Sequence, residues 1–195
     1  MQASDSAGPA KRFPRVLVIH GSRFGQSTKI AEAISDGLVA CGVGTDVGAL
    51  TATTTPDPER HDGLVLVTSV RYGHFDRNAG RLIQRHRAWL DSVPTLLVTV
   101  SLTARTPEKR DPAVHVYTRK FLAKTNWQPT QVEVMAGALE YPRYNILDRE
   151  AIRLIMRMTG GPTDPTTNIE YTDWDRAAEV AREFAAVLRG PSLAD

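Results

Sequence analysis

Short apolar runs alternate along the chain with segments of helical periodicity. The runs cover residues 16–19, 45–47, 63–69, 95–101 and 131–137, and the clearest is Gly-Leu-Val-Leu-Val-Thr-Ser at 63–69. Continuous apolar runs of this length are typical of parallel strands that are buried on both faces. Because helix-like segments separate the runs, the order predicts a doubly wound α/β fold with five parallel strands.

Helices are predicted in the intervals between these strands and after the last one. The first ends at Gly42 and has one apolar face, formed by Ile30, Ile34, Leu38 and Cys41. The next runs from Asn78 to about Asp91, and His86 on its apolar stripe is expected to be a helix-surface or boundary residue rather than a ligand. Another helix includes Tyr117 and Phe121. The last begins near Thr172, and five of its residues are expected to face inward: Trp174, Ala177, Ala181, Phe184 and Leu188.

Residues 138–172 lie between the fifth strand and the last helix and exceed what the minimal fold needs. A helix is predicted over 146–159, with Asn145 and Asp148 as capping residues. Its arginines recur every four residues and form one basic stripe, which consists of Arg149, Arg153 and Arg157. Such a helix could lie on an anionic bilayer, or it could pack its apolar side on the sheet and leave the arginines in water.

Three loops follow the carboxyl ends of predicted strands, where doubly wound sheets bind their ligands. The loop over 21–28 joins a strand to a helix through Gly, Ser and Thr, which leaves backbone N–H groups free at a helix N-terminus. It suits a phosphate monoester, although an ordinary strand–helix turn has the same composition. It matches neither the dinucleotide nor the nucleoside triphosphate fingerprint, so both of those ligand classes lose support.

The other two loops cover 69–75 and 101–105. The first of them reads Ser-Val-Arg-Tyr-Gly-His-Phe and combines aromatic, cationic and titratable groups. A planar ring could stack on Tyr72 there, or Tyr72 and Phe75 could simply close the end of the sheet.

The composition, with 42% hydrophobic and 24% charged residues among 195, suits one soluble domain over residues 16–190. Residues 1–15 have no apolar centre, so we expect a disordered extension rather than a signal peptide, and a cytoplasmic protein. The lone cysteine, Cys41, excludes an intramolecular disulfide and a cysteine-rich metal site, and no metal is expected. The net charge of residues 71–157 is +7, and that of the rest of the chain is −5. This asymmetry favours an anionic ligand or an anionic membrane surface, although a solvated basic face without a partner has the same pattern.

Taken together, these loops and the insertion resemble the flavodoxin-like, menaquinone-dependent protoporphyrinogen IX dehydrogenase family of bacteria. The resemblance extends from about Val16 to Leu188. Its most specific segments are Ser69-Val-Arg-Tyr-Gly-His74, Ala104-Arg-Thr-Pro-Glu-Lys-Arg110, Tyr117-Thr-Arg-Lys-Phe-Leu122, Ala136-Gly-Ala-Leu-Glu-Tyr-Pro-Arg-Tyr144 and Tyr171-Thr-Asp-Trp174. Several such blocks in order are far more specific than one glycine-rich loop.

This resemblance implies a flavodoxin fold, with strand order 2-1-3-4-5 and a long helical insertion, that holds FMN noncovalently. It implies oxidation of protoporphyrinogen IX to protoporphyrin IX, the penultimate step of this route to haem, in three two-electron cycles of FMN. Electrons would pass to menaquinone or another membrane quinone such as ubiquinone, with the protein held peripherally at the cytoplasmic face of the inner membrane. No nucleic acid is expected as a partner, and a homo-oligomer is left open.

Carried onto this chain, the resemblance implies three sets of site residues. The FMN phosphate loop would consist of Ser22, Arg23, Phe24, Gly25, Gln26, Ser27 and Thr28. The loops that flank the flavin ring would consist of Ser69, Val70, Arg71, Tyr72, Gly73 and His74, and of Ser101, Leu102, Thr103, Ala104 and Arg105. Phe24 departs from the general flavodoxin pattern, in which a small hydroxyl residue is common at this place.

Catalytic contributions are expected from His74, Arg71 and Arg105. Histidine is the residue type that titrates near neutral pH, so His74 is the first candidate for proton handling, unless it only hydrogen-bonds the loop. Arg71 and Arg105 could pair with substrate propionates or stabilise the reduced flavin, and Arg143 and Arg149 are further candidates for the propionates. Two other functions remain open, a flavodoxin-type electron carrier and an NAD(P)H-quinone reductase.

Overall fold

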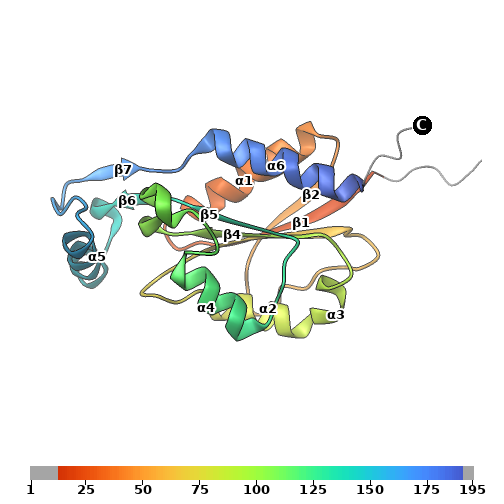
Figure 1. Cartoon of the computed structure of the whole chain (residues 1–195), viewed down its shortest axis with the longest axis horizontal. Helices are drawn as coiled ribbons and strands as arrows, with labels where there is room; N and C mark the ends of the chain where they lie inside the picture. Colours follow the sequence, from red (N-terminus) through yellow and green to blue (C-terminus); the bar gives the residue numbers. More distant parts are fainter. Residues whose placement is uncertain (1–12, 191–195) are drawn as a thin grey trace, which may run out of the picture.

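The computed structural model describes residues 13–190, in which a central sheet lies between two layers of helices (Figure 1). The sheet has five parallel strands in the order β2-β1-β3-β4-β5. Their bounds are β1 (Arg15–Gly21), β2 (Gly44–Ala49), β3 (Gly63–Ser69), β4 (Thr95–Val100) and β5 (Gln131–Met135). The predicted fold and strand order are therefore confirmed. Of the extension predicted over 1–15, residues 1–12 lie outside the described part, and Arg15 already belongs to β1.

Helices α1 (Gln26–Ala40) and α6 (Trp174–Arg189) cover one face of the sheet (Figure 1). Ile30, Ile34 and Phe184 are fully buried there against strand residues such as Val65. The two helices touch closely, because a Cβ atom at Gly37 would lie 2.6 Å from that of Ala181.

The opposite face is covered by α2 (Arg77–Arg85), α3 (Arg87–Leu90) and α4 (Val116–Thr125). Leu64 and Leu66 of β3 pack there with Ile83, Phe121 and Trp127. Burial of both faces of the strands accounts for the continuous apolar runs that predicted them.

Two helical predictions were wrong in detail. The helix predicted over 78–91 is broken at His86, whose backbone leaves the helical region at φ −114° and ψ 24°. Beyond the break, Arg87 donates to the carbonyl oxygen of Thr125 at the end of α4. This contact joins the start of α3 to α4. Trp174 does not face inward, because it is the first residue of α6 and is 39% exposed.

The insertion contains more structure than its sequence pattern predicted. Besides α5 (Ile146–Met158), it forms a two-stranded antiparallel sheet from β6 (Ala138–Glu140) and β7 (Asn168–Glu170). These strands have three residues each, too few for a visible periodicity. Figure 1 shows α5, β6 and β7 together beyond one end of the main sheet.

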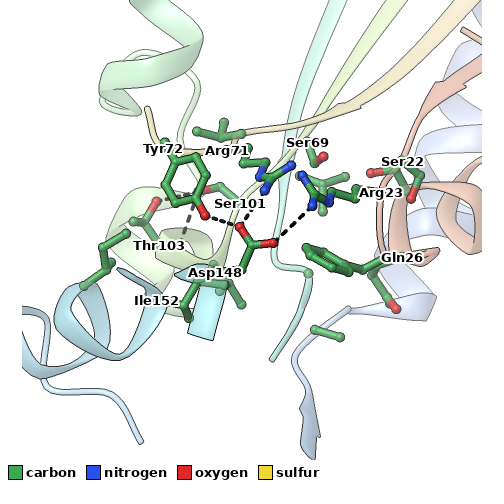
Figure 2. A pocket seen from close by; sticks show the side chains of 18 of the residues that line it. Ser22, Arg23, Gln26, Ser69, Arg71, Tyr72, Ser101, Thr103, Asp148 and Ile152 are labelled. Atoms are coloured by element: carbon green, nitrogen blue, oxygen red, sulfur yellow. Dashed lines mark hydrogen bonds and ion pairs between the residues drawn. The ribbon is translucent and has the colours of Figure 1, made fainter. Parts of the chain in front are cut away.

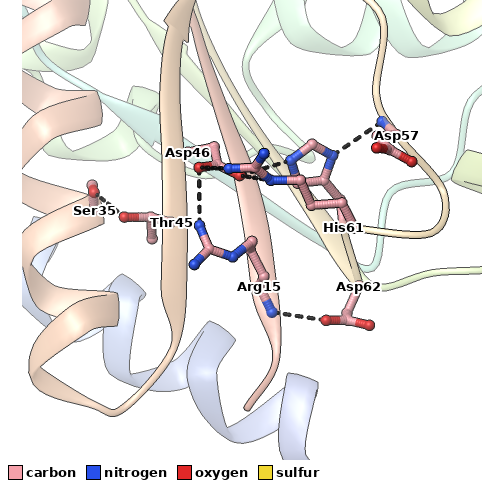
Figure 3. Close-up of polar contacts among 8 residues, drawn as sticks. Arg15, Ser35, Thr45, Asp46, Asp57, His61 and Asp62 are labelled. Carbon is pink, nitrogen blue, oxygen red and sulfur yellow. Dashed lines mark hydrogen bonds and ion pairs between the residues drawn. The ribbon is translucent and has the colours of Figure 1, made fainter. Parts of the chain in front are cut away.

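A polar cluster on the edge strand closes the long connection between β2 and β3 (Figure 3). Asp46 of β2 accepts hydrogen bonds from Arg15 at 3.0 Å and from Arg60 at 2.8 and 2.9 Å, and contacts the His61 ring at 3.0 Å. The other ring nitrogen of His61 accepts from the backbone of Asp57. One carboxylate thus joins three segments of the chain.

Candidate active site

A cavity lies at the carboxyl ends of β1, β3 and β4, and the insertion covers one side of it (Figure 2). Thirteen of the predicted cofactor residues line it: Ser22, Arg23, Phe24, Gln26, Ser27, Ser69, Val70, Arg71, Tyr72, Gly73, Ser101, Leu102 and Thr103. Five others are not among the lining residues: Gly25, Thr28, His74, Ala104 and Arg105. The structure therefore brings all three predicted loops to one cavity.

The first loop ends in an N-terminus of α1 that has room for an anion. Gly25 is the N-cap residue and adopts φ +95°, a conformation that glycine reaches without strain. No side chain of the described residues caps α1 there, and the Ser22 hydroxyl instead accepts a hydrogen bond from the Gly25 N–H. The free N–H groups of the first turn and the buried Ser27 hydroxyl suit a phosphate.

The second loop is a tight turn that sends its side chains in different directions. The backbones of Arg71 and His74 exchange two hydrogen bonds, of 2.8 and 2.9 Å. Tyr72 and Gly73 between them both have positive φ, of 47° and 79°. The ring of Tyr72 and the guanidinium of Arg71 reach the cavity, whereas the His74 side chain is exposed outside it.

The third loop is fixed from behind by hydrogen bonds. Thr103 contacts Ser101 at 2.9 Å and the buried ring of His115 at 3.2 Å. Arg105 turns away from the cavity and donates to the backbone and hydroxyl oxygens of Thr159, at 2.7 and 2.8 Å. Arg105 thereby attaches this loop to the carboxyl end of α5.

Several lining residues were not predicted as site residues, among them Tyr117, Glu140, Tyr144, Asp148, Ile152 and Ile155. Asp148 is the charged one that faces the predicted loops directly. Asn145 and Asp148 were both predicted as capping residues of α5. Asn145 provides the cap, whereas the Asp148 carboxylate points into the cavity. It accepts hydrogen bonds from Tyr72 and Arg71, and Arg23 Nη2 lies 3.3 Å from its other oxygen. The Tyr72 hydroxyl and the Arg71 guanidinium hold the pKa of this carboxyl below its ordinary value.

A signal for this role was present in the helical spacing. Asp148, Ile152 and Met156 share one face of α5, and this is the face that packs on the rest of the molecule. A carboxylate on an otherwise apolar inward face calls for a cationic partner.

Contacts with the insertion explain why a large aromatic residue stands at position 24. Its ring lies 4.7 Å from the ring of Tyr144, centroid to centroid, within a cluster that also contains Leu139, Tyr141 and Met156. Phe24 thus joins the phosphate loop to the insertion, where a small hydroxyl residue could not.

The two further predicted propionate ligands lie outside the cavity lining. Arg143 donates to the Glu140 carboxylate at 2.9 Å, and Arg149 lies 3.8 Å from that of Glu150. On the same side of the insertion, Gln26 donates to Glu170 and Thr172, which ties the start of α1 to β7.

Comparison with known proteins defines the class of this chain. A family model described as a flavodoxin domain matches residues 17–166. Among solved structures, a mutant flavodoxin from Pseudomonas aeruginosa has a TM-score of 0.51 and 15% identity, over 90% of this chain and 99% of that one. An archaeal flavodoxin has a TM-score of 0.50 and 9% identity over the same shares. The chain belongs to the flavodoxin domain family, and the prediction of an FMN cofactor is confirmed at the level of the family.

Its curated relatives narrow the class further. The protein of Escherichia coli (strain K12) named protoporphyrinogen IX dehydrogenase [quinone] is 39% identical over 92% of this chain and 99% of that protein. A Leishmania major protein with the same name is 38% identical over 91% of this chain and 78% of that protein. The family resemblance predicted from the sequence is confirmed, and the match to the Escherichia coli relative is long enough to include the insertion.

Proposed function

We propose that this protein is an FMN-dependent oxidoreductase that converts protoporphyrinogen IX to protoporphyrin IX and delivers the electrons to a quinone. The similarity to the Escherichia coli relative over nearly its whole length carries this proposal. A simple electron carrier needs only the flavodoxin core, whereas here the insertion contributes residues to the cavity itself. The function therefore belongs to the core and the insertion together.

The residues around the cavity fit both FMN and a tetrapyrrole. We assign the cofactor phosphate to the N-terminus of α1 with Ser22 and Ser27, and the flavin ring to loops 69–74 and 101–105. When bound, FMN supplies the two-electron acceptor chemistry. Arg71 Nε is buried and has no hydrogen-bond partner among the described residues, so this side chain has a donor free for a ligand.

Both apolar and cationic side chains line the cavity. Phe24, Tyr144, Ile152 and Ile155 give it apolar walls suited to a macrocycle, and the arginines supply positive charge for carboxylates. Of the three residues expected to take part in catalysis, Arg71 is the one among the lining residues, and we assign substrate contact to it. Protons released from the substrate would then pass to water, because His74 is exposed and is not among the lining residues.

Helix α5 supports a peripheral association with the cytoplasmic face of the inner membrane, where a lipid-soluble quinone is reached. Leu147, Leu154 and Met158 are 82, 60 and 78% exposed on one side of the helix, and the exposed Arg157 lies beside them. Exposed apolar side chains with a basic flank are typical of helices that lie in a bilayer interface. Within residues 13–190, no helix is long and apolar enough to cross a membrane.

The test is to mix the FMN-loaded protein anaerobically with protoporphyrinogen IX and to record the flavin and porphyrin absorption bands. We expect the oxidised-flavin band to bleach as the porphyrin band grows, and ubiquinone or menaquinone analogues to restore the flavin band. If the flavin band stays unchanged, the assignment fails. Rapid bleaching by NADH would favour a quinone reductase, and stable accumulation of a one-electron-reduced flavin would favour an electron carrier.

A further inference from the structure

The cavity contains a carboxylate-binding site that is filled by a carboxylate of the protein itself. Arg71 Nη2 donates to Asp148 Oδ1 at 2.5 Å, Tyr72 donates to the same oxygen, and Arg23 Nη2 lies 3.3 Å from Oδ2 (Figure 2). The two hydrogen-bond donors, Arg71 and Tyr72, come from the loop after β3, and the Arg23 guanidinium comes from the loop after β1. The carboxylate comes from α5, and its Oδ2 atom is buried without a hydrogen-bond partner among the described residues. The Asp148 side chain is only 4% exposed, whereas Arg23 and Arg71 are 49 and 35% exposed.

The charges of this site do not balance. Two guanidinium groups face one carboxylate, so the site keeps a net positive charge while Asp148 is ionised. Its donor capacity is also incomplete, because Arg71 Nε is buried and has no partner among the described residues. A planar carboxylate from a ligand would meet the same donors in the same geometry.

We propose that a propionate of the tetrapyrrole takes the place of Asp148 between Arg23, Arg71 and Tyr72. This inference rests on the proposed function. An exchange of one carboxylate for another keeps the charge-assisted hydrogen bonds, so the departure of Asp148 costs the site little interaction free energy. The released carboxylate lies in the first turn of α5, where the helix dipole stabilises a negative charge.

The exchange would couple substrate entry to the position of the insertion. Ile152 and Ile155 of α5 also line the cavity, so release of Asp148 frees the apolar wall of the same helix. The turn that contains Tyr72 can rearrange when Asp148 leaves, because Tyr72 is half exposed and adopts a positive φ. Binding of the substrate carboxylate would therefore displace Asp148 and allow α5 to move away from the cavity.

The anion that displaces Asp148 could also be the FMN phosphate, because Arg23 belongs to the phosphate loop. The experiment separates these sources by using protein already loaded with FMN. The probes are mesoporphyrin IX, which has two free propionates, and its dimethyl ester, which has none. Both affinities are measured by fluorescence titration in the same mild detergent.

We expect Asp148→Asn to bind the free acid about tenfold more tightly than the wild type, with less than a twofold change for the ester. Arg71→Ala should bind the free acid with about tenfold lower affinity than the wild type. Its affinities for the free acid and for the ester should therefore be similar. Asp164→Asn is the matched control, because this exposed carboxylate of the insertion accepts hydrogen bonds from Thr166 and from no other residue within 13–190. Equal or weaker binding of the free acid by Asp148→Asn would overturn the exchange, and so would a gain confined to FMN affinity.

Hydrogen exchange in the wild type gives a second readout that needs no variant. We expect residues 146–158 to exchange faster when the free acid binds, and to be unaffected by the ester. Slower exchange would mean that α5 closes on the ligand, which contradicts the proposal. Binding of the free acid without these effects would overturn the exchange alone, whereas no binding at all would overturn the proposed function as well.

Discussion

The Nε2 atom of His115 lies 3.2 Å from the Thr103 hydroxyl, so a buried histidine supports a residue that lines the cavity. The other ring nitrogen, Nδ1, accepts from the backbone N–H of Thr118 and caps α4. The Thr118 hydroxyl also lies 2.6 Å from Nδ1. With Nδ1 as the acceptor of the cap, the neutral ring has its proton on Nε2, which then donates toward Thr103. A protonated ring could not cap the helix, because Nδ1 would then be a donor as well.

The first prediction concerns acid stability through His115. Burial, and then the charge of Lys109, lower the pKa of this ring in the folded state, so the unfolded chain binds the proton more readily. The contribution is fully present above the unfolded pKa of about 6.5 and is lost as the pH falls below it. We expect His115→Asn, which keeps a capping side chain, to lose less unfolding free energy than the wild type between pH 7.5 and 5.5.

Urea unfolding at both pH values measures this difference. His74→Gln is the control, because that side chain is exposed and backbone hydrogen bonds between Arg71 and His74 hold the turn. An equal pH dependence in wild type and His115→Asn would contradict the prediction.

The second prediction concerns the left-handed N-cap of α1. Gly25→Ala forces a Cβ atom onto a residue with φ +95°, which costs about 1–2 kcal/mol or shifts the loop. Because this loop presents the free N–H groups of α1, FMN affinity should fall about tenfold, as measured by quenching of flavin fluorescence.

Gly80→Ala is the matched control for Gly25→Ala. Gly80 lies inside α2, and a Cβ atom there meets no atom within 4 Å. Alanine should therefore raise the unfolding free energy by about 0.4–1 kcal/mol and leave FMN affinity unchanged. Similar effects of both substitutions on FMN binding would show that the conformation of Gly25 does not matter.

The sequence was sufficient to predict the sheet because buried parallel strands leave a strong local pattern. Gly63–Ser69 shows this best, since its predicted and observed bounds are identical. Loops that follow such strands must meet at one edge, which is how Ser22, Arg71 and Thr103 could be assigned to one cavity.

The role of Asp148 could not be predicted in the same way. Its partners Arg71 and Tyr72 lie 77 and 76 residues earlier, and only the folded insertion brings them together. A carboxylate at the start of a helix is also what an ordinary cap requires, so the local pattern favoured the simpler interpretation. The strands β6 and β7 were not predicted, because three residues are too few to show the two-residue alternation of a strand.

The third prediction concerns the edge-strand cluster around Asp46. Hydrogen bonds from Arg60, and further contacts with His61 and Arg15, lower the pKa of this carboxyl in the folded state. The resulting stability is present above the unfolded pKa of about 3.9 and is lost as the pH falls through the folded value. Because Arg60 is largely exposed, Asp46→Asn should cost only about 0.5–1 kcal/mol at pH 7.

The difference between Asp46→Asn and the wild type should shrink between pH 5 and pH 2, as followed by urea unfolding. Asp91→Asn removes a half-exposed carboxylate paired with Arg87 and serves as the control for loss of a simple surface ion pair. A deficit of the same size at both pH values would show that Asp46 stabilises the fold by packing rather than by charge.

The last prediction tests whether α5 is the surface that meets the membrane. Leu154 is 60% exposed, and inserting such a side chain into the interface is worth about 1.5–3 kcal/mol. Leu154→Glu should therefore bind anionic vesicles at least tenfold more weakly, with its FMN content unchanged. Val39→Glu is the matched control, because Val39 is similarly exposed, at 56%, but lies on α1 of the core.

The same experiment separates the apolar side of α5 from its arginines. Arg157→Glu should weaken vesicle binding mainly at low salt, since a basic side chain near an anionic surface contributes about 1 kcal/mol and is screened. The loss in Leu154→Glu should persist at high salt because burial of apolar surface is not screened. If Leu154→Glu cosediments with vesicles as well as Val39→Glu does, α5 is not the docking surface, and the basic residues of the core become the next candidates.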